Sequence, residues 1–297
     1  MFKKWLVRHE ETLAGYICAL PWILGISLFI VGPMIASVIF SFQDYSMLLP
    51  SRWVGLENYR TLLFRDPLVW KTLYNTFYVT VLGVPLRMIF ALCLALLLNQ
   101  KVKGMAIFRT LFYMPTVVPQ VATALLWMWI LNPQVGIVNH ILGWFGIQGP
   151  MWLASATWSK PALIFMSLWG VGGDMIIYLA GLQNIPQHLY DASEVDGAGT
   201  WKRFWSITIP MLSPTLFFTF VMGIIGALQT FTEAYVMTGG GPVDSTLFYV
   251  YHLFNMAFRD FRMGYASALA WFLFVLVFAA TMINMWGSKR WVYYEVE

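Results

Sequence analysis

Residues 12–42, TLAGYICALPWILGISLFIVGPMIASVIFSF, contain no charged side chain. A helix needs about 20 mostly apolar residues to cross a bilayer, so this run is long enough for one tilted or kinked span. Either Pro21 or Pro33 can supply the kink. The rest of the chain is similar: 59% of its 297 residues are hydrophobic and 11% are charged, whereas soluble domains are about 25% charged. This composition excludes a soluble enzyme, a disordered tail and a disulfide scaffold, and predicts an integral membrane protein.

Five more apolar stretches follow, at about residues 77–98, 111–131, 161–182, 213–237 and 264–286. The stretch 111–131 belongs to a charge-free run over 110–159 that is too long for one span, and Asn132-Pro133-Gln134 divides this run. The second part of that run is then expected to be a polar-aromatic loop. We therefore predict an all-α membrane protein with six transmembrane helices.

An even number of spans places both termini on the same side of the membrane. The segments expected inside carry ten basic residues and the opposite loops carry seven: Lys3, Lys4, Arg8, Lys101, Lys103, Arg109, Lys202, Arg203, Lys289 and Arg290, against Arg52, Arg60, Arg65, Lys71, Lys160, Arg259 and Arg262. This positive-inside bias predicts N-in and C-in. The first apolar run is about twice the length of a signal-peptide core, so we expect an uncleaved signal-anchor helix.

Motifs for nucleotide, metal and redox chemistry are missing from the sequence. No G-x-x-x-x-G-K-[ST] occurs, the four histidines are scattered, and Cys18 and Cys93 lie inside apolar runs as expected of packing residues. We expect no catalytic residue, metal or cofactor in this chain. The small, dispersed net charge of +4 also argues against nucleic acid as a partner. A membrane-embedded enzyme, whose residues meet only in three dimensions, stays open at this point.

The most specific segment is the expected inner loop, residues 185–212, which includes QHLYDASEVDGAGTWKRFWSITIP over 187–210. It gathers five charges in a chain with few: Asp191, Glu194, Asp196, Lys202 and Arg203. Pro186 is suited to open a short helix, on which Leu189, Ala192 and Val195 share a face. Gly197 and Gly199 permit a reversal of the chain.

A second amphipathic piece with apolar Phe204, Trp205 and Ile207 follows this reversal, and Pro210 and Pro214 are expected to restart the next span. Two interpretations are open for the loop. It lies on the lipid surface, or it docks a cytoplasmic protein. A lipid-surface helix is normally basic, whereas the first limb here is acidic, which favours a protein partner.

This loop resembles the EAA loop of ABC-importer permeases. The resemblance rests on Asp191-Ala-Ser-x-x-Asp196-Gly197-Ala198 followed, after the intervening residues, by Ile207-x-Ile209-Pro210. The family pattern begins Glu-Ala-Ala, so Asp-Ala-Ser is a mild departure. Further stretches resemble the carbohydrate branch of maltose and glycerol-3-phosphate type, and together they span nearly the whole chain: Gly55-Leu-Glu-Asn-Tyr59, Asn75-Thr76, Arg109-Thr-Leu-Phe-Tyr-Met-Pro115, Gly136-Ile-Val-Asn139, Ala180-Gly-Leu-Gln-Asn-Ile-Pro186, Thr238-Gly-Gly-Gly-Pro242 and Gly264-Tyr-Ala-Ser-Ala268.

The resemblance implies a bundle of the type I importer permease and a role for the loop as a coupling helix. It assigns the ATPase contacts to Asp191, Ala192, Ser193, Asp196 and Gly197. It also implies a second homologous permease subunit, two ATPase subunits and an extracytoplasmic solute-binding protein, with the chain in a bacterial inner membrane. Asp196→Lys or Gly197→Asp is then predicted to leave insertion intact and to uncouple transport.

Three ionisable residues lie in or near the spans: Arg87, Asp174 and Glu233. A charge at the bilayer centre costs several kcal/mol, so it is expected to face the bundle and pair. Arg87 and Asp174 either pair across the bundle or line the path of a polyol. Glu233 either contacts a docked binding protein or stays hydrated at the outer mouth. Any single intramembrane Trp is more readily explained by packing or by the interfacial belt than by sugar binding.

We divide the chain into residues 1–70 (tail, first span and outer loop), 71–287 (a five-helix permease core with the coupling loop) and 288–297 (a cytoplasmic tail). The predicted function is a permease subunit forming half of the path for a sugar or oligosaccharide in an ATP-driven importer. An importer of the same architecture for glycerol-3-phosphate or another polar solute is the alternative, and a stand-alone channel or membrane-embedded enzyme ranks lower.

Overall fold

The computed structural model describes residues 10–46, 49–100 and 102–293. The basic residues Lys3, Lys4 and Arg8, and the last four residues of the expected C-terminal tail, 294–297, lie outside these ranges. The chain forms two compact units: residues 1–65 with 253–273, and residues 66–252 with 274–297. The first unit therefore takes in a late segment that the division at residue 70 did not include, and that division stays a prediction.

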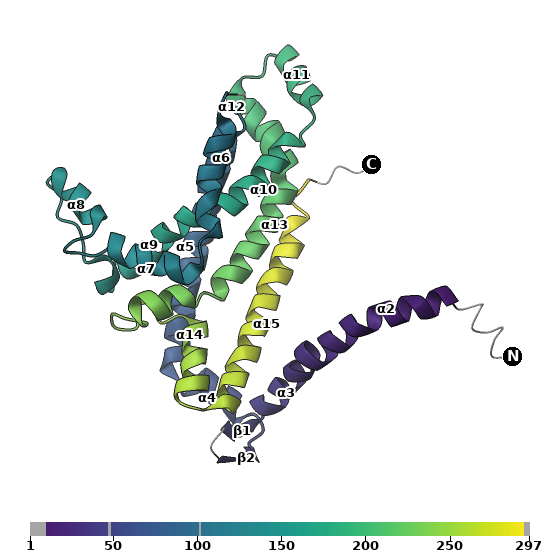
Figure 1. The fold of residues 1–297 in the computed structure, drawn as a ribbon, viewed down its shortest axis with the longest axis vertical. Coiled ribbons are helices and arrows are strands. Elements are labelled where there is room, and N and C mark those ends of the chain that lie inside the picture. Colours follow the sequence, from purple (N-terminus) through teal and green to yellow (C-terminus); the bar gives the residue numbers. More distant parts are fainter. Residues whose placement is uncertain (1–9, 47–48, 101, 294–297) are drawn as a thin grey trace. The chain divides into compact units, whose positions relative to one another are not determined.

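The first unit begins with a long apolar helix and contains a small β-hairpin (Figure 1). Its elements are α2 (Glu10–Ile26), η1 (Ser27–Val31), α3 (Gly32–Ser41), β1 (Gln43–Ser46), β2 (Leu49–Trp53), α4 (Glu57–Phe64), η7 (Asn255–Arg259) and the first part of α15 (Met263–Ser288). The antiparallel β1–β2 pair was not predicted from the sequence. Asn58 fixes its start, because Nδ2 donates to the carbonyl oxygens of Ser41 and Gln43 at 2.9 Å each. Gly264 packs so closely against the Gln43 carbonyl that a Cβ would lie 2.0 Å from it.

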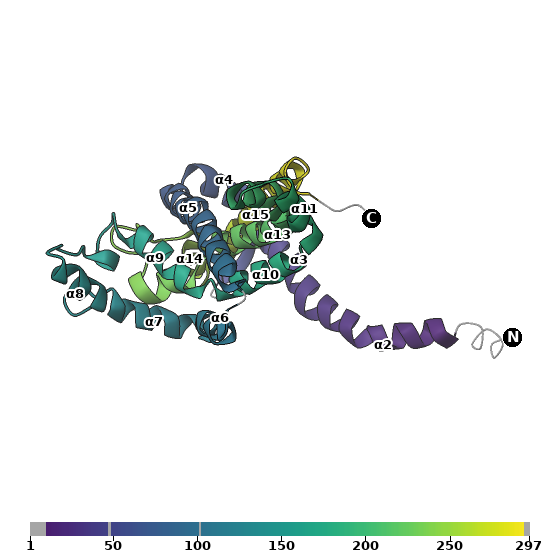
Figure 2. The same cartoon turned by 90° about the horizontal axis from the view of Figure 1, so that it is seen from above.

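The second unit holds the remaining helices. They are α5 (Pro67–Leu98), α6 (Met105–Tyr113), η2 (Met114–Val117), α7 (Gln120–Ile130), α8 (Ile137–Trp144), η3 (Trp152–Ala154), α9 (Ser159–Ser167), η4 (Leu168–Gly170), α10 (Gly172–Gln183), α11 (Gln187–Val195), α12 (Thr200–Arg203), η5 (Phe204–Thr208), α13 (Ile209–Leu228), η6 (Ala234–Thr238), most of α14 (Tyr249–Phe254) and the end of α15. Figures 1 and 2 both show α8 at the far end of α7, away from α10, α11 and α13.

Four single helices of the described chain are long and apolar enough to cross a membrane: Ala14–Ser41, Pro67–Leu98, Thr200–Leu228 and Met263–Ser288. Two bent pairs meet the same test, Met105–Val117 with Gln120–Ile130 and Ser159–Gly170 with Gly172–Gln183, with bends of 100° and 51°. The predicted six spans are thus reached when each bent pair is one span. This confirms an all-α membrane fold with one small β-hairpin added.

The third span differs from the prediction of one helix over 111–131. It starts earlier, at Met105, and breaks at Val118-Pro119. The Pro119 ring disfavours helical backbone at the residue before it, and Val118 indeed adopts φ −71° and ψ 129°. The proline therefore ends the first half and turns the chain into α7.

The fifth span also departs from the prediction. Pro210 and Pro214 do not restart a helix, because the helix runs unbroken from Thr200 to Leu228. A π-helical turn, η5, directly precedes α13 and Pro210. Such a wide turn relieves the missing N–H and the ring clash that a proline brings to the preceding turn. The helix ends at Leu228, so Glu233 lies beyond the span rather than inside it.

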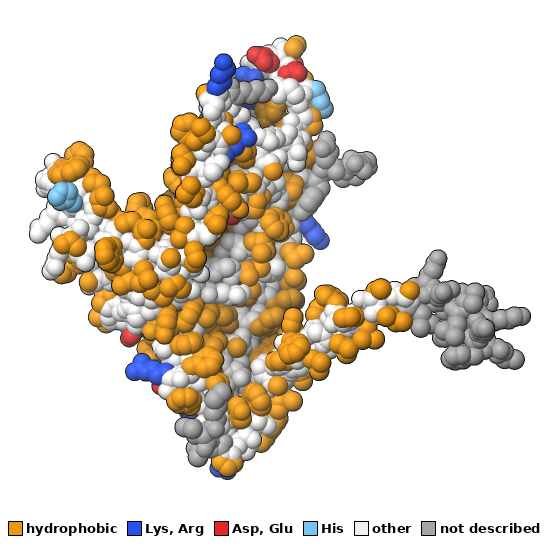
Figure 3. All heavy atoms as spheres, in the orientation of Figure 1, with side chains coloured by type: hydrophobic (Ala, Val, Ile, Leu, Met, Phe, Trp, Pro, Cys, Tyr) orange, Lys and Arg blue, Asp and Glu red, His pale blue; other side chains and the backbone are white. Residues whose placement is uncertain are grey.

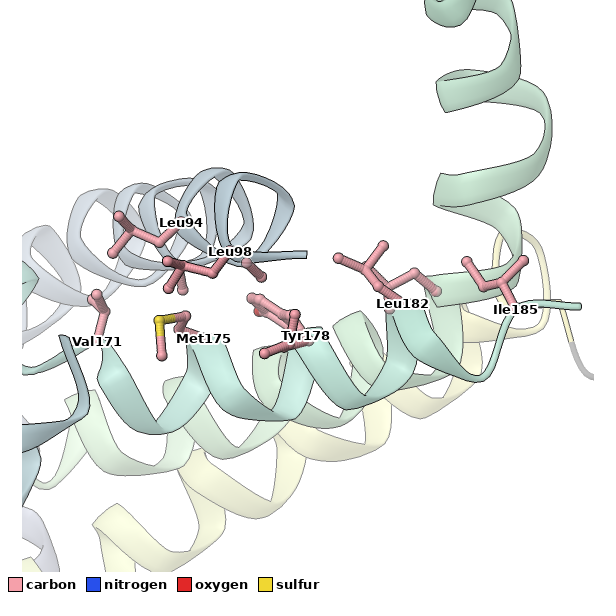
Figure 4. Close-up of a cluster of buried hydrophobic side chains, with 11 residues drawn as sticks. Leu94, Leu98, Val171, Met175, Tyr178, Leu182 and Ile185 are labelled. Atoms are coloured by element: carbon pink, nitrogen blue, oxygen red, sulfur yellow. The ribbon is translucent and has the colours of Figure 1, made fainter. Parts of the chain in front are cut away.

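The core of the second unit lies where α5, α10 and α13 pack together (Figure 4). Small residues on α5, Ala91 and Ala95, let Met175 and Tyr178 of α10 approach closely. The buried Tyr178 hydroxyl is 2.7 Å from the Thr219 hydroxyl of α13, so the polar tip of this side chain is satisfied. Leu189, Tyr190 and Ile207 of the neighbouring loop pack against this cluster.

Residues 245–252 of the second unit, which follow Pro242, form a largely buried segment. Its residues Leu247, Phe248 and Tyr249 are buried. Two side chains of α5 hold it: Asn75 Nδ2 donates to the Leu247 carbonyl at 3.1 Å, and the Thr76 hydroxyl accepts from the Tyr249 amide at 3.0 Å. Residues 245–252 are thus part of the packed second unit.

Candidate coupling surface and intramembrane polar residues

Helix α11 is a short, well-delimited helix at the end of α10. Pro186 caps its start with an extended backbone, φ −61° and ψ 129°. At its other end Gly197 takes the left-handed conformation, with φ +72°. The Gly197 amide donates to the Glu194 carbonyl at 3.0 Å and the Ala198 amide to the Ser193 carbonyl at 2.9 Å. These two hydrogen bonds together form a Schellman motif, which ends the helix and requires at position 197 a residue that tolerates positive φ.

The inner face of α11 packs on the core of the second unit. Leu189 and Tyr190 lie against the buried cluster of α5, α10 and α13. The Tyr190 hydroxyl is 3.0 Å from the Thr208 hydroxyl of η5, and the Ser193 hydroxyl donates to the Tyr190 carbonyl at 2.7 Å. These contacts fix α11 to the two spans on either side of the loop.

The outer face of α11 carries the remaining predicted site residues. The sequence placed Leu189, Ala192 and Val195 on one face, but only Leu189 packs inward. Ala192 is exposed, and Val195 is 89% exposed. Of the three, only Leu189 is partly buried, so the apolar spacing on this helix does not correspond to a buried face. Val195 is thus an exposed apolar side chain on a helix whose two ends are fixed.

Acidic groups surround this exposed apolar residue. Asp191, Glu194 and Asp196 are all exposed, and Figure 3 shows acidic side chains at the end of the molecule where α11 lies. Glu194 Oε2 lies 3.6 Å from Arg203 Nη1 of α12, which ties the two limbs of the loop together. The surface thus presents an apolar centre with a negative rim.

The second limb carries an exposed aromatic group. Trp201 and Trp205 are 72% and 55% exposed, and each ring also contacts Phe204, which is half-buried. The sequence predicted a second amphipathic piece with Phe204, Trp205 and Ile207 as its apolar residues. In the structure only Ile207 packs against the core, while Trp205 faces outward.

Arg87 and Asp174 form an ion pair in the span region. Arg87 Nε donates to Asp174 Oδ2 at 3.0 Å, and Arg87 Nη2 donates to the Gly170 carbonyl at 3.3 Å. The pairing hypothesis is therefore confirmed. Asp174 and Gly170 lie on opposite sides of the break between η4 and α10, so one guanidinium from α5 holds both sides of the bend in the fourth span.

The bends of the third and fourth spans lie against each other. A Cβ at Gly172 would be 2.4 Å from the Phe112 carbonyl oxygen and 2.8 Å from the Tyr113 Cα. Only glycine permits this approach of α10 to the end of α6. Sequence reasoning missed this position, although the Gly172-Gly173 pair beside Asp174 was a usable signal.

Glu233 follows the end of α13 and contacts the start of α7. Its Oε1 accepts from Gln120 Nε2 at 2.7 Å. Its Oε2 is buried and has no hydrogen-bond partner within the described part of the chain. Glu233 is therefore held by α7, and its two expected roles, contact with a docked binding protein or hydration at the outer mouth, stay predictions. Gln120 was not singled out from the sequence.

Comparison with known proteins adds the following findings. Residues 83–292 match the family model described as binding-protein-dependent transport system inner membrane component. The chain is 43% identical over 97% of its length to the probable ABC transporter permease protein YesP of Bacillus subtilis, covering 94% of that protein. It is 36% identical over 95% of its length to the sulfoquinovosyl glycerol transport system permease protein SmoG of Agrobacterium fabrum, covering 92% of it. A chain of a bacterial alginate ABC transporter crystal structure shares the fold, with a TM-score of 0.86 at 24% identity over 98% of this chain and 99% of that one.

Proposed function

The chain belongs to the family of binding-protein-dependent transport system inner membrane components, and we propose that it is the permease subunit of an ATP-driven bacterial importer for a sugar or oligosaccharide. The chain lies in the inner membrane and forms half of the translocation path. A second, homologous permease forms the other half. An extracytoplasmic binding protein delivers the solute, and two separate ATPase subunits hydrolyse ATP.

One observation supports the link to an ATPase most strongly. Helix α11 is rigid, fixed to two spans on its inner face, and presents Val195 at 89% exposure among acidic side chains. A partner that binds this face needs an apolar pocket with a basic rim. Because Leu189 and Tyr190 pack on the core of α5, α10 and α13, displacement of α11 moves these helices with it.

The proposed contacts on α11 are Asp191, Ala192, Asp196 and Gly197, with Ser193 in a supporting role. The first four are exposed, whereas the Ser193 hydroxyl bonds within the helix. The relative SmoG, by its name, serves sulfoquinovosyl glycerol, which favours a carbohydrate over glycerol-3-phosphate as the solute class. Neither a stand-alone channel nor a membrane enzyme accounts for an exposed acidic coupling helix.

The Arg87–Asp174 pair is proposed to hold the bend of the fourth span. Its two bonds cross the break between η4 and α10, and its side chains are 41% and 28% exposed. The partial exposure leaves a second role open to test, since a pair facing the path can also hydrogen-bond a polyol.

Photo-cross-linking from α11 tests the proposed function. A photoreactive residue placed at Val195 in the assembled importer is expected to form an adduct with the ATP-hydrolysing subunit. Val275 on α15, which is 58% exposed and apolar, is the matched control and gives no such adduct. Equal adducts from both positions, or none from Val195, would contradict the assignment.

A further inference from the structure

The segment 132–158 between α7 and α9, called the α8 hairpin below, is held together from inside by Asn139. Asn139 Nδ2 donates to the Pro133 carbonyl at 3.1 Å and to the Pro150 carbonyl at 3.2 Å. Asn139 Oδ1 accepts from Trp152 Nε1 at 2.6 Å. Gly149 lies so close to this amide that a Cβ would be 2.1 Å from Asn139 Oδ1. The two limbs of the hairpin are therefore fixed to each other by the hydrogen bonds of Asn139, two of which are partly buried.

The base of the hairpin is equally well defined. Asn132 Oδ1 accepts from the amides of Gln134 and Val135 at 2.9 and 3.1 Å, and the Asn132 carbonyl accepts from the Gly136 amide at 2.9 Å. These are the local bonds by which Asn builds a turn. These hydrogen bonds fix the direction in which the hairpin leaves α7, and with it the direction in which the side chains of the hairpin point.

The side chains that this frame turns outward are large and apolar. Val135, Trp144 and Phe145 are 84%, 74% and 75% exposed, and Ile147 and Met151 are more than half exposed. Figure 3 shows hydrophobic side chains over α8 together with a histidine, and no Lys, Arg, Asp or Glu side chain there on the face drawn. A patch of this kind on a rigid element indicates that something apolar covers it.

The sequence around the hairpin shows what that covering is. Residues 110–159 contain no Asp, Glu, Lys or Arg. A docking site for a soluble binding protein has a polar rim around an apolar centre, and this surface has no charged rim. The exposed apolar face also continues onto α7 through Leu125 and Trp129, so it extends the surface of a membrane span.

We propose that the α8 hairpin is a monotopic anchor that lies in the lipid bilayer at its boundary with water, on the membrane side opposite α11. Trp144 and Phe145 enter the region between headgroups and acyl chains, at a depth of about 5–10 Å. Trp favours this zone because its ring is apolar and its N–H reaches water. The assignment to the outer leaflet rests on the proposed function, while the lipid contact itself does not.

Depth measurement with spin labels tests this anchor in the assembled importer. Cys18 and Cys93 are first replaced by Ala, since both native cysteines are exposed. A nitroxide is attached at Trp144→Cys or Phe145→Cys, and the importer is reconstituted in phosphatidylethanolamine and phosphatidylglycerol vesicles. Val275→Cys on α15 serves as the lipid reference and Arg52→Cys on β2 as the water reference.

At positions 144 and 145 we expect collisions with oxygen to exceed collisions with a water-soluble nickel chelate. The ratio is expected between those of the two references and nearer to Val275→Cys, and unchanged when solute-loaded binding protein is added. A ratio like that of Arg52→Cys, or one that changes with the binding protein, would overturn the proposal. Low collision rates with both reagents would also overturn it, because they mean that protein covers the hairpin. An intact depth profile in an importer whose Val195 fails to cross-link to an ATPase would count against the proposed function only.

Discussion

Two protrusions of the second unit, α11 and the α8 hairpin, expose large apolar side chains, but they differ in charge. Val195 on α11 stands among three acidic residues, whereas Trp144 and Phe145 belong to a stretch of 110–159 with no charged residue. Both are rigid: a Schellman motif closes the first, and Asn139 ties the second. The surrounding charge, and not exposure alone, therefore distinguishes a protein-facing surface from a lipid-facing one.

The way each protrusion is attached also differs. The inner face of α11 packs on the core cluster through Leu189 and Tyr190. The α8 hairpin is fixed mainly by bonds within itself. A force applied to α11 is thus passed to α5, α10 and α13, while the hairpin is suited to hold a position rather than to transmit a movement.

The largest expected effect comes from replacing Gly197, because this residue closes the C-terminal end of α11. Its φ is +72° and the space around it is open, so backbone conformation alone opposes a side chain there. Left-handed backbone costs an L residue about 1–2 kcal/mol. An energy of this size lowers the equilibrium constant for docking of α11 on the ATPase subunit about tenfold. Gly197→Val is expected to reduce solute uptake by this order, with the amount of protein in the membrane unchanged.

Gly197→Asn is the matched control, since Asn tolerates the left-handed region. It should keep most of the uptake, and Gly197→Asp should lose it through added charge at the partner surface. Equal uptake by all three variants would mean that the C-terminal end of α11 does not affect transport. The proposed difference between α11 as a coupling element and the α8 hairpin as an anchor would then be lost.

A smaller effect is expected from the replacement of Arg87 on α5. Arg87→Met leaves Asp174 and the Gly170 carbonyl without their donor. Because both side chains are partly exposed, the loss of stability should be about 1–2 kcal/mol rather than the value for a fully buried pair. Thermal unfolding of the solubilised protein measures it.

The charge-swapped double variant, Arg87→Asp with Asp174→Arg, separates the two roles of the pair. Restored stability together with restored uptake indicates that the pair holds the bend of the fourth span. Restored stability without uptake indicates that the pair lines the path. A swap that restores neither shows that the bond to the Gly170 carbonyl, which needs a donor at position 87, dominates.

The sequence was sufficient for features that depend on composition and local pattern. Long apolar runs predicted α5 and α15, and scarcity of charge made Arg87 and Asp174 natural partners. Pro186 and Gly197 predicted the ends of α11 within a residue, because each has a backbone preference of its own.

Features that depend on tertiary packing were not predictable. The apolar run 111–131 was read as one helix although Pro119 was a usable signal for a break, whereas the 100° bend and the contact of Gly172 with Phe112 and Tyr113 depend on packing. Pro210 was read as a helix start, whereas the preceding π-helical turn lets the helix continue. The exposure of Val195, in contrast to the partly buried Leu189, depends on how α11 packs against the core and is not encoded in its own spacing.

Paired photo-cross-linking tests the central claim most directly, with the reactive residue at Val195 in one sample and at Trp144 in the other. In the assembled importer we predict that Val195 yields an adduct with the ATP-hydrolysing subunit and that Trp144 yields adducts with phospholipid alone. A lipid adduct as the sole product at Val195, or an ATPase adduct at Trp144, would contradict the account.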